Sequence, residues 1–205
     1  MKLEEVYGIG PALAEKLKPL VGRRKFEDCY KEPEIFALLP LATKMYMKYR
    51  PVDKLKRSII VPTAQKLERA GAIVAGSYRR GAEYCRDIDI LVRREDLANL
   101  LRAAVFTKPH AEGEEIIRCF IKVSGVYMMA DIFIYTPDIF PFMLLYTTGN
   151  KEFNKRMRGI AKAKGLKLNQ HGLYKKNKPI ADLKSELDIF TALDMNYLEP
   201  YQRTI

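Results

Sequence analysis

Residues 76–93 have the sequence GSYRRGAEYCRDIDILVR, and this stretch says most about the fold of the chain. Its opening Gly-Ser closes a short apolar run, and the alternation from Asp87 onward predicts a strand with one charged face. Side chains two residues apart share a face of a strand, so Asp87 and Asp89 are expected to point the same way. Two neighbouring carboxylates repel each other unless a cation lies between them, and Mg²⁺ prefers such oxygen ligands. The stretch therefore predicts a strand that carries a metal site.

A third carboxylate lies further along the chain. Asp131 interrupts the apolar run 126–135, which is predicted to pair with 116–123 through a turn at Ser124 and Gly125. A charge inside such a run is costly unless a partner or a metal meets it. Taken alone, Asp131 could be a salt-bridged acid, and the Asp-x-Asp pair could be a solvated strand face. Together, the three acids predict a two-metal site for phosphoryl transfer.

The residues that precede the acidic pair suit a phosphate. Glycine at position 76 allows backbone N–H groups to approach phosphate oxygens, and the hydroxyl of Ser77 can add a hydrogen bond. The guanidinium of Arg80 can bind phosphate through two parallel hydrogen bonds. These groups are near enough to the acidic pair in sequence to deliver a triphosphate to the metals.

Three segments differ in periodicity. Residues 1–68 read as helices, and residues 69–136 alternate as strands around one helix at 96–104. Residues 137–205 return to helices around a polar hairpin at 166–180. The expected fold class is α+β, with an N-terminal helical subdomain, a mixed β-sheet and a small C-terminal α/β subdomain.

Composition narrows the partners. The 205 residues include 36 Lys and Arg against 25 Asp and Glu, a formal net charge of +11. This excess favours a polyanion such as nucleic acid, although a basic soluble protein or one that meets acidic membranes is the alternative. Three scattered cysteines and two separated histidines argue against a disulfide framework or a zinc site. No apolar stretch approaches the roughly 20 residues that span a bilayer, so we expect no membrane segment and an intracellular protein.

The motifs occur in the order typical of one enzyme family. Residues 76–81, with the Asp-x-Asp pair, look like the nucleotidyltransferase signature of the family X DNA polymerases. The similarity continues through LYTTG at 145–149, FNKRMR at 153–158 and YLEP at 197–200. Upstream, VYGIGP at 6–11 resembles the helix-hairpin-helix of that family. The resemblance covers nearly the whole chain, and the pattern is similar to polymerase beta-like members of a minimal viral type, for which no lyase domain is expected.

The resemblance implies roles for individual residues. Asp87, Asp89 and Asp131 would bind two Mg²⁺ ions, for which Mn²⁺ can substitute. The residues implied to bind the incoming nucleotide are Gly76, Ser77, Arg80, Arg86, Tyr146, Gly149, Lys151 and Asn154. The residues implied to bind DNA are Gly8, Gly10, Lys155, Arg158 and Lys162. The residues whose carbonyl groups would hold Na⁺ or K⁺ at the helix-hairpin-helix are Glu4, Val6 and Ile9.

The basic residues of 155–162 can also be interpreted without DNA binding, and two positions depart from the family pattern. The stripe of Lys155, Arg158 and Lys162 suits a phosphate backbone, but it would equally serve as a solvated helix face. Met129 and Phe133 stand where the family places arginines beside the third aspartate, so control of closure by arginine is in doubt.

The resulting hypothesis is a nucleotidyltransferase palm that works as a DNA-directed DNA polymerase. Its substrates would be a dNTP and gapped or primer–template DNA, and its role short-gap filling in base-excision-type repair, without lyase activity. We expect a monomer that acts with a DNA ligase and an AP endonuclease, in the nucleus or in a viral factory or virion. A template-independent nucleotidyltransferase and a non-catalytic DNA-binding module remain as alternatives.

Overall fold

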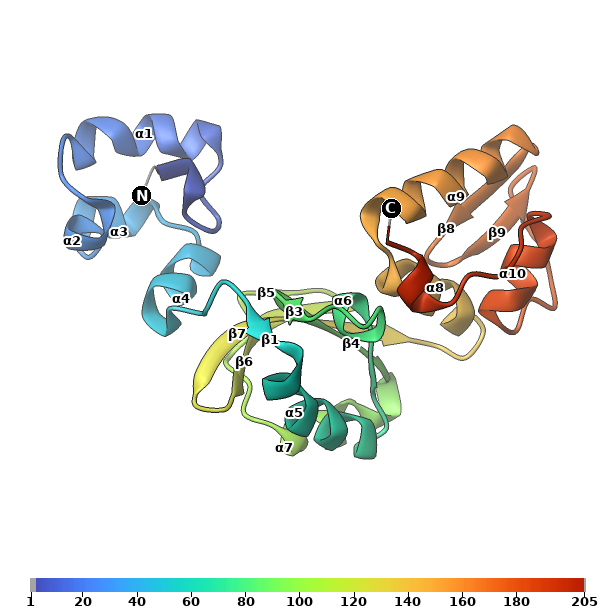
Figure 1. Cartoon of the computed structure of the whole chain (residues 1–205). Helices are drawn as coiled ribbons and strands as arrows, with labels where there is room; N and C mark the ends of the chain where they lie inside the picture. Colours follow the sequence, from blue (N-terminus) through green and yellow to red (C-terminus); the bar gives the residue numbers. More distant parts are fainter. Residues whose placement is uncertain (1–2, 205) are drawn as a thin grey trace. The chain divides into compact units, whose positions relative to one another are not determined.

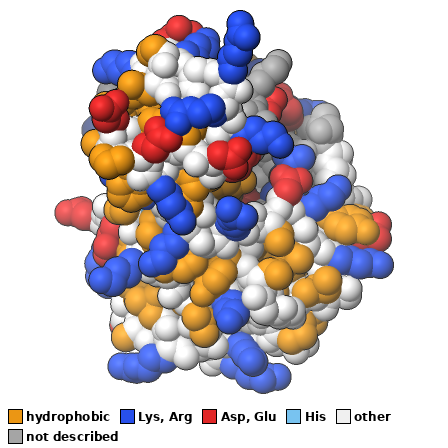
Figure 2. Space-filling model, turned by 90° about the vertical axis from the view of Figure 1, so that its left-hand side faces the viewer, with side chains coloured by type: hydrophobic (Ala, Val, Ile, Leu, Met, Phe, Trp, Pro, Cys, Tyr) orange, Lys and Arg blue, Asp and Glu red, His pale blue; other side chains and the backbone are white. Residues whose placement is uncertain are grey.

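The structure is a computed structural model that describes residues 3–204 (Figure 1). The chain divides into two compact units, Met1–Pro51 and Val52–Ile205. No helix within residues 3–204 is both long and apolar enough to cross a membrane. Lys and Arg side chains are interleaved with hydrophobic ones on the face drawn in Figure 2, as the net charge of +11 leads one to expect.

The first unit is built from short helices. In chain order they are η1 (Leu3–Glu5, a 3-10 turn), α1 (Pro11–Val21), α2 (Phe26–Cys29), α3 (Pro33–Leu38) and α4 (Leu41–Tyr49). Proline opens α1 and α3, where its missing N–H group would have no helical partner anyway. Leu17, Phe26 and Ile35 meet in the buried core of this unit.

A glycine-dependent turn precedes α1. Gly8 has a φ of +83°, and a Cβ atom there would lie 2.7 Å from Oγ1 of Thr43. The Thr43 hydroxyl donates a hydrogen bond to the carbonyl of Tyr7 at 3.0 Å, which ties the turn to α4. Ahead of the turn, the described residues form only the 3-10 turn η1, not a full helix. The helix-hairpin-helix therefore stays a prediction.

The second unit contains a five-stranded mixed sheet. Its order is β2 (Ile73–Val74), β4 (Asp87–Arg93), β7 (Val126–Tyr135), β6 (Ile116–Val123) and β5 (Ala111–Glu112). Strands β4 and β7 are parallel and the other neighbours are antiparallel. The predicted turn at Ser124 and Gly125 joins β6 to β7. The mixed sheet and the α+β class expected from the sequence are confirmed.

One face of the sheet is covered by helices α5 (Arg57–Arg69) and α7 (Leu97–Ala103) (Figure 1). Alternate residues of β4, among them Ile88 and Ile90, join the α5 residues Ile60 and Leu67 in one buried cluster. This packing explains why the boundary between the units lies at residue 51 and not at the expected residue 68. The apolar stripe of α5 is buried against the sheet, so the helix folds with the second unit.

The remaining elements of the sheet region are small. They are β1 (Leu55–Lys56), which pairs with β3 (Tyr84–Cys85), together with α6 (Gly76–Arg79) and η2 (Arg94–Asp96). The part of the chain that follows β7 has its own core. Its elements are α8 (Phe140–Thr148), α9 (Lys151–Ala163), β8 (Leu166–Asn169), β9 (Gly172–Lys175), β10 (Lys178–Pro179), α10 (Glu186–Ala192) and η3 (Pro200–Gln202).

A buried ionic network joins α6 to this last part. The Glu186 carboxylate accepts hydrogen bonds from Nη2 of Arg79 at 2.8 Å and from Nη1 of Arg203 at 2.6 Å. Arg79 also donates to the hydroxyl of Thr148 at 2.6 Å. The side chain of Glu186 is 5% exposed and that of Arg203 is fully buried. Burial alone would raise the pKa of Glu186, but the two arginines outweigh it and hold that pKa below its usual value.

We expect Glu186→Gln to lower the free energy of unfolding of the second unit by about 3 kcal/mol, because it leaves a buried arginine charge unpaired. Since the folded-state pKa is lowered, the stabilising contribution of Glu186 is complete above its unfolded value of 4.5. That contribution is lost as the pH falls through the folded-state pKa. Urea unfolding of both proteins should therefore show the difference at pH 7 and its narrowing on acidification below that value.

The matched control is Glu152→Gln, which removes an exposed carboxylate paired with Lys155 at 3.9 Å. An exposed pair contributes little to stability, so this variant should unfold almost as the native chain does. Equal destabilisation by the two substitutions would contradict the role given to the buried network.

Candidate functional site

Three carboxylates share the face of the sheet that α5 does not cover. In the parallel ladder Asp89 lies directly opposite Asp131, and Asp87 precedes Asp89 by two residues on the same face. All three border one open cavity of 740 Å³. The residues that line it are Arg80, Asp87, Asp89, Ile116, Arg118, Asp131, Phe133, Tyr146, Thr147, Gly149, Asn150, Lys151, Asn154, Lys155 and Arg158.

The negative charges of Asp87, Asp89 and Asp131 repel one another. Burial, followed by the charges of Asp87 and Asp131, raises the pKa of Asp89 to about 8. Burial and then the charge of Asp131 raise the pKa of Asp87, and burial raises that of Asp131. Carboxylates in this situation give up their protons readily only when a cation offsets their charge. The donor set is therefore suited to a hard divalent cation.

Helix α6 approaches the acids closely at Gly76. This residue has a φ of +57°, and a Cβ atom there would lie 1.9 Å from Oδ2 of Asp89. A side chain cannot be accommodated at that distance, so the position requires glycine. The adjacent Ser77 hydroxyl is buried beside the thiol of Cys85, whose pKa is raised by burial. The two residues thus support the wall of the cavity, although neither borders it.

Arg80 presents a cation to the same cavity. Its Nη1 donates a hydrogen bond to the carbonyl of Thr148 at 2.5 Å. Its Nε atom is buried and finds no hydrogen-bond partner within the described residues. Burial lowers the pKa of this guanidinium, and the charges of Asp89 and Asp87 oppose that effect. An unpaired buried donor is costly, so this group suits an anionic ligand.

Arg118 is a site residue that the sequence reasoning missed. It lies opposite Asp131 in the β6–β7 ladder, and its Nε atom is 3.3 Å from Oδ2 of Asp131. Counting back from the predicted turn at Ser124 and Gly125 would have placed the two residues opposite each other. Within residues 3–204, no three Asp, Glu, His or Cys side chains stand close enough together to cage a metal. The ion pair holds Asp131 toward Arg118, so binding of one metal by all three acids would require this pair to open.

Residues of α8 and α9 form the opposite wall. The amide of Asn154 donates to the carbonyl of Tyr146 at 2.7 Å. The Arg158 guanidinium lies 5.5 Å from the ring centroid of Tyr146, and the Phe133 ring lies 6.5 Å away at a steep angle. The Asn150 side chain caps α9 by accepting a hydrogen bond from the N–H of Phe153 at 2.9 Å. This cap satisfies a backbone N–H at the start of α9, the helix from which Lys151, Lys155 and Arg158 border the cavity.

The expected site residues fall into three groups. Those that border the cavity are Arg80, Asp87, Asp89, Asp131, Tyr146, Gly149, Lys151, Asn154, Lys155 and Arg158. Those that belong to the second unit but do not border the cavity are Gly76, Ser77, Arg86 and Lys162. Those that belong to the first unit are Glu4, Val6, Gly8, Ile9 and Gly10. The lining residues for which no role was expected include Ile116, Arg118 and Asn150.

Comparisons with known proteins agree on one family. Residues 50–117 match the family model of the DNA polymerase beta palm, and residues 143–204 match that of the DNA polymerase beta thumb. DNA polymerase lambda of Arabidopsis thaliana is 28% identical, over 98% of this chain and 45% of its own length. DNA-directed DNA/RNA polymerase mu of Homo sapiens is 24% identical, over 99% of this chain and 52% of its own length.

A solved structure shows the same fold. Leishmania infantum polymerase beta, crystallised as a ternary P/T complex, superposes with a TM-score of 0.84 at 22% identity. The alignment covers 100% of this chain and 97% of that one. By contrast, the chain spans only about half the length of the polymerase lambda and mu relatives named above.

We expect Arg118→Ala to tighten the binding of Mn²⁺, used as a probe, by up to about fivefold, because a part-exposed ion pair is worth up to about 1 kcal/mol. The metal would no longer have to displace Arg118 from Asp131. Titration calorimetry or electron paramagnetic resonance measures the affinity of the metal alone.

Lys122→Ala is the matched control for this substitution. It removes one exposed positive charge from the same strand, at the ladder position opposite Tyr127 and away from the acids. If Arg118→Ala binds Mn²⁺ no more tightly than Lys122→Ala does, the arginine does not compete with the metal.

Proposed function

This chain belongs to the family X DNA polymerases, and we propose that it extends a primer 3′-hydroxyl by one deoxynucleoside monophosphate at a time, directed by a template strand. The observation that carries the proposal is the register of β4 and β7, which sets three carboxylates on one cavity wall beside Arg80. Phosphoryl transfer depends mainly on positioning and on offsetting negative charge, and this cavity offers groups for both.

The acidic wall would hold the divalent metal ions that polymerases of this family use. We assign Asp87 and Asp89 to both of two Mg²⁺ ions, and Asp131 to the one nearer the primer. Such ions lower the pKa of an attacking hydroxyl and offset the charge of a departing pyrophosphate. The raised pKa values of the acids support the assignment, because these groups need positive charge in order to ionise together.

The chain's own residues would bind and orient the nucleotide. Arg80 carries an unpaired buried donor and suits the triphosphate. Lys151 borders the same cavity from the start of α9 and adds charge there. The amide of Asn154 donates to the backbone carbonyl of Tyr146, and both residues border the cavity. There the ring of Tyr146 would crowd a ribose 2′-hydroxyl and the side chain of Asn154 would contact the base.

Duplex DNA would be held through its phosphates. Lys155, Arg158 and Lys162 are exposed on α9 and offer charge without reading sequence. The turn at Gly8 and Gly10 in the first unit would offer backbone N–H groups in the same manner. We propose single-nucleotide and short gaps as the substrate in repair. The expected absence of lyase activity, the monovalent cation at Glu4, Val6 and Ile9, and the ligase and endonuclease partners stay predictions.

Asp131→Ala should reduce nucleotide incorporation by about 10²- to 10³-fold or more on a gapped template, because the loss of one electrostatic catalytic group costs about that much. Binding of the gapped duplex should persist, since Asp131 carries negative charge and does not attract phosphate. Single-turnover extension and fluorescence anisotropy measure the two quantities. Asp53→Ala, which removes an exposed acid outside the cavity, should leave both unchanged.

Dependence on a template and on Asp131 distinguishes the proposed polymerase from the two alternative functions. Extension on a one-nucleotide gap should follow the template base, and a single-stranded primer without a template should be extended far less. Equal extension of the two substrates would favour a template-independent transferase. Unchanged function in the Asp131→Ala variant would favour a non-catalytic DNA-binding module.

A further inference from the structure

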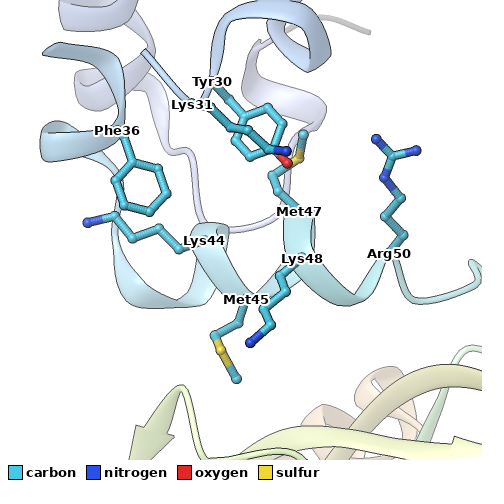
Figure 3. Close-up of a pocket in the computed structure, with 8 residues that line it drawn as sticks. All are labelled: Tyr30, Lys31, Phe36, Lys44, Met45, Met47, Lys48 and Arg50. Atoms are coloured by element: carbon cyan, nitrogen blue, oxygen red, sulfur yellow. The ribbon is translucent and has the colours of Figure 1, made fainter. Parts of the chain in front are cut away.

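The first unit contains a groove with no part in the site described above. It has a volume of 630 Å³, within the range of ligand-binding pockets, and lies between α3, α4 and the segment after α2 (Figure 3). Tyr30 and Met47 form its buried floor, 8% and 5% exposed, respectively. Phe36 forms a wall and is 41% exposed, so one aromatic side chain is open to solvent beside an apolar floor.

The rim of the groove is positively charged. Lys31, Lys44, Lys48 and Arg50 line it, and no Asp or Glu does. Residues 35–51 contain no acidic residue at all. None of the four cations makes an ion pair within the described part of the chain. The groove thus attracts a polyanion and, unlike the acidic cavity, needs no metal to do so.

Cations and rings are interleaved along the groove. The Nζ atom of Lys44 lies 4.5 Å from the ring centroid of Phe36, and that of Lys31 lies 5.7 Å from the centroid of Tyr30 (Figure 3). Lys44 and Lys48 are four residues apart on α4, so they lie on the same side of the helix. Stacking rings beside lysines is the chemistry that binds unpaired bases and their phosphates together.

We propose that this groove binds unpaired nucleotides of single-stranded DNA, with the ring of Phe36 stacking on a base and Lys44 and Lys48 holding the phosphates. The proposal rests on the proposed function for the identity of its partner, since a DNA polymerase meets unpaired strand ahead of its primer. An acidic peptide would use the lysines equally well. It would, however, leave the exposed face of Phe36 without a planar partner, which is why nucleic acid is favoured.

The sequence contains no tryptophan, so a single substitution creates a specific reporter. Phe36→Trp places an indole in the groove, and Tyr201→Trp places one at a position that is 64% exposed in the second unit. Both are titrated with a ten-residue oligothymidylate in EDTA and without nucleotide. We expect saturable quenching of the fluorescence in Phe36→Trp and none in Tyr201→Trp.

The phosphate contacts are tested by removing charge. The variant with Lys44→Gln and Lys48→Gln should bind the oligothymidylate more weakly, with a salt slope reduced by about 1.4, because each single-strand phosphate contact adds about 0.7. The control variant, Lys16→Gln with Lys25→Gln, removes the same charge from exposed positions outside the groove. Its affinity and slope should stay close to those of the native chain. Circular dichroism confirms that each variant is folded.

Three results would overturn the proposal. They are the absence of quenching in Phe36→Trp, equal loss of affinity in the two charge variants, and stronger quenching by a ten-residue oligoglutamate than by the oligothymidylate. The last result would assign the groove to an acidic peptide. None of these measurements requires catalysis, so failure of the groove and failure of the polymerase activity are observed separately.

Discussion

The parallel, in-register pairing of β4 with β7 is the constraint on which the second unit depends. It places Asp89 opposite Asp131 and, with Asp87, gathers three negative charges on one part of a sheet. Such a concentration is unfavourable in a partly dry cavity, as the pKa of about 8 for Asp89 indicates. Positive charge must therefore come from neighbours or from bound ions. Among the neighbours, Arg80 and Arg118 supply positive charge at this cavity.

Arg79, the last residue of α6, and Arg80, which directly follows the helix, have different roles. Successive residues of a helix point in different directions, so Arg79 and Arg80 reach different partners. Arg79 is held in the network with Glu186 and Thr148, whereas Arg80 reaches the cavity wall and keeps a buried donor unpaired. The network fixes α6 against α8 and α10, and this in turn fixes the position of Arg80. Structural stability and anion binding are thus connected through one short helix.

Much of this arrangement could be predicted from the sequence, because it depends on local patterns. The alternation around Asp87 and Asp89 predicted β4, and the turn at Ser124 and Gly125 predicted the β6–β7 hairpin. The structure also shows a capping box of Ser185 and Asp188 at the start of α10, a motif of the same local kind.

Other features depend on contacts between distant residues and could not be found in the same way. The residues next to Arg118 in the sequence do not mark it as a partner of Asp131, and only counting across the β6–β7 hairpin places the two opposite each other. The boundary at residue 51 depends on the packing of α5 against the sheet, and the helical pattern of that segment does not reveal which core it joins. The exposure of the Phe36 ring could not be predicted either, because the sequence does not show whether a phenylalanine is buried or exposed.

The acidic cavity and the basic groove differ in charge but share one type of contact. Each sets a cation near an aromatic ring: Arg158 lies 5.5 Å from the ring of Tyr146, and Lys44 lies 4.5 Å from that of Phe36. Only the cavity adds carboxylates, so a polyanion entering it requires further positive charge, whereas one entering the groove does not. Binding in the cavity should therefore depend on divalent metal and binding in the groove should not. A chain with a net charge of +11 can attract a polyanion at many places. Under the proposed function, dependence on metal would distinguish the site of phosphoryl transfer from a site that only binds DNA.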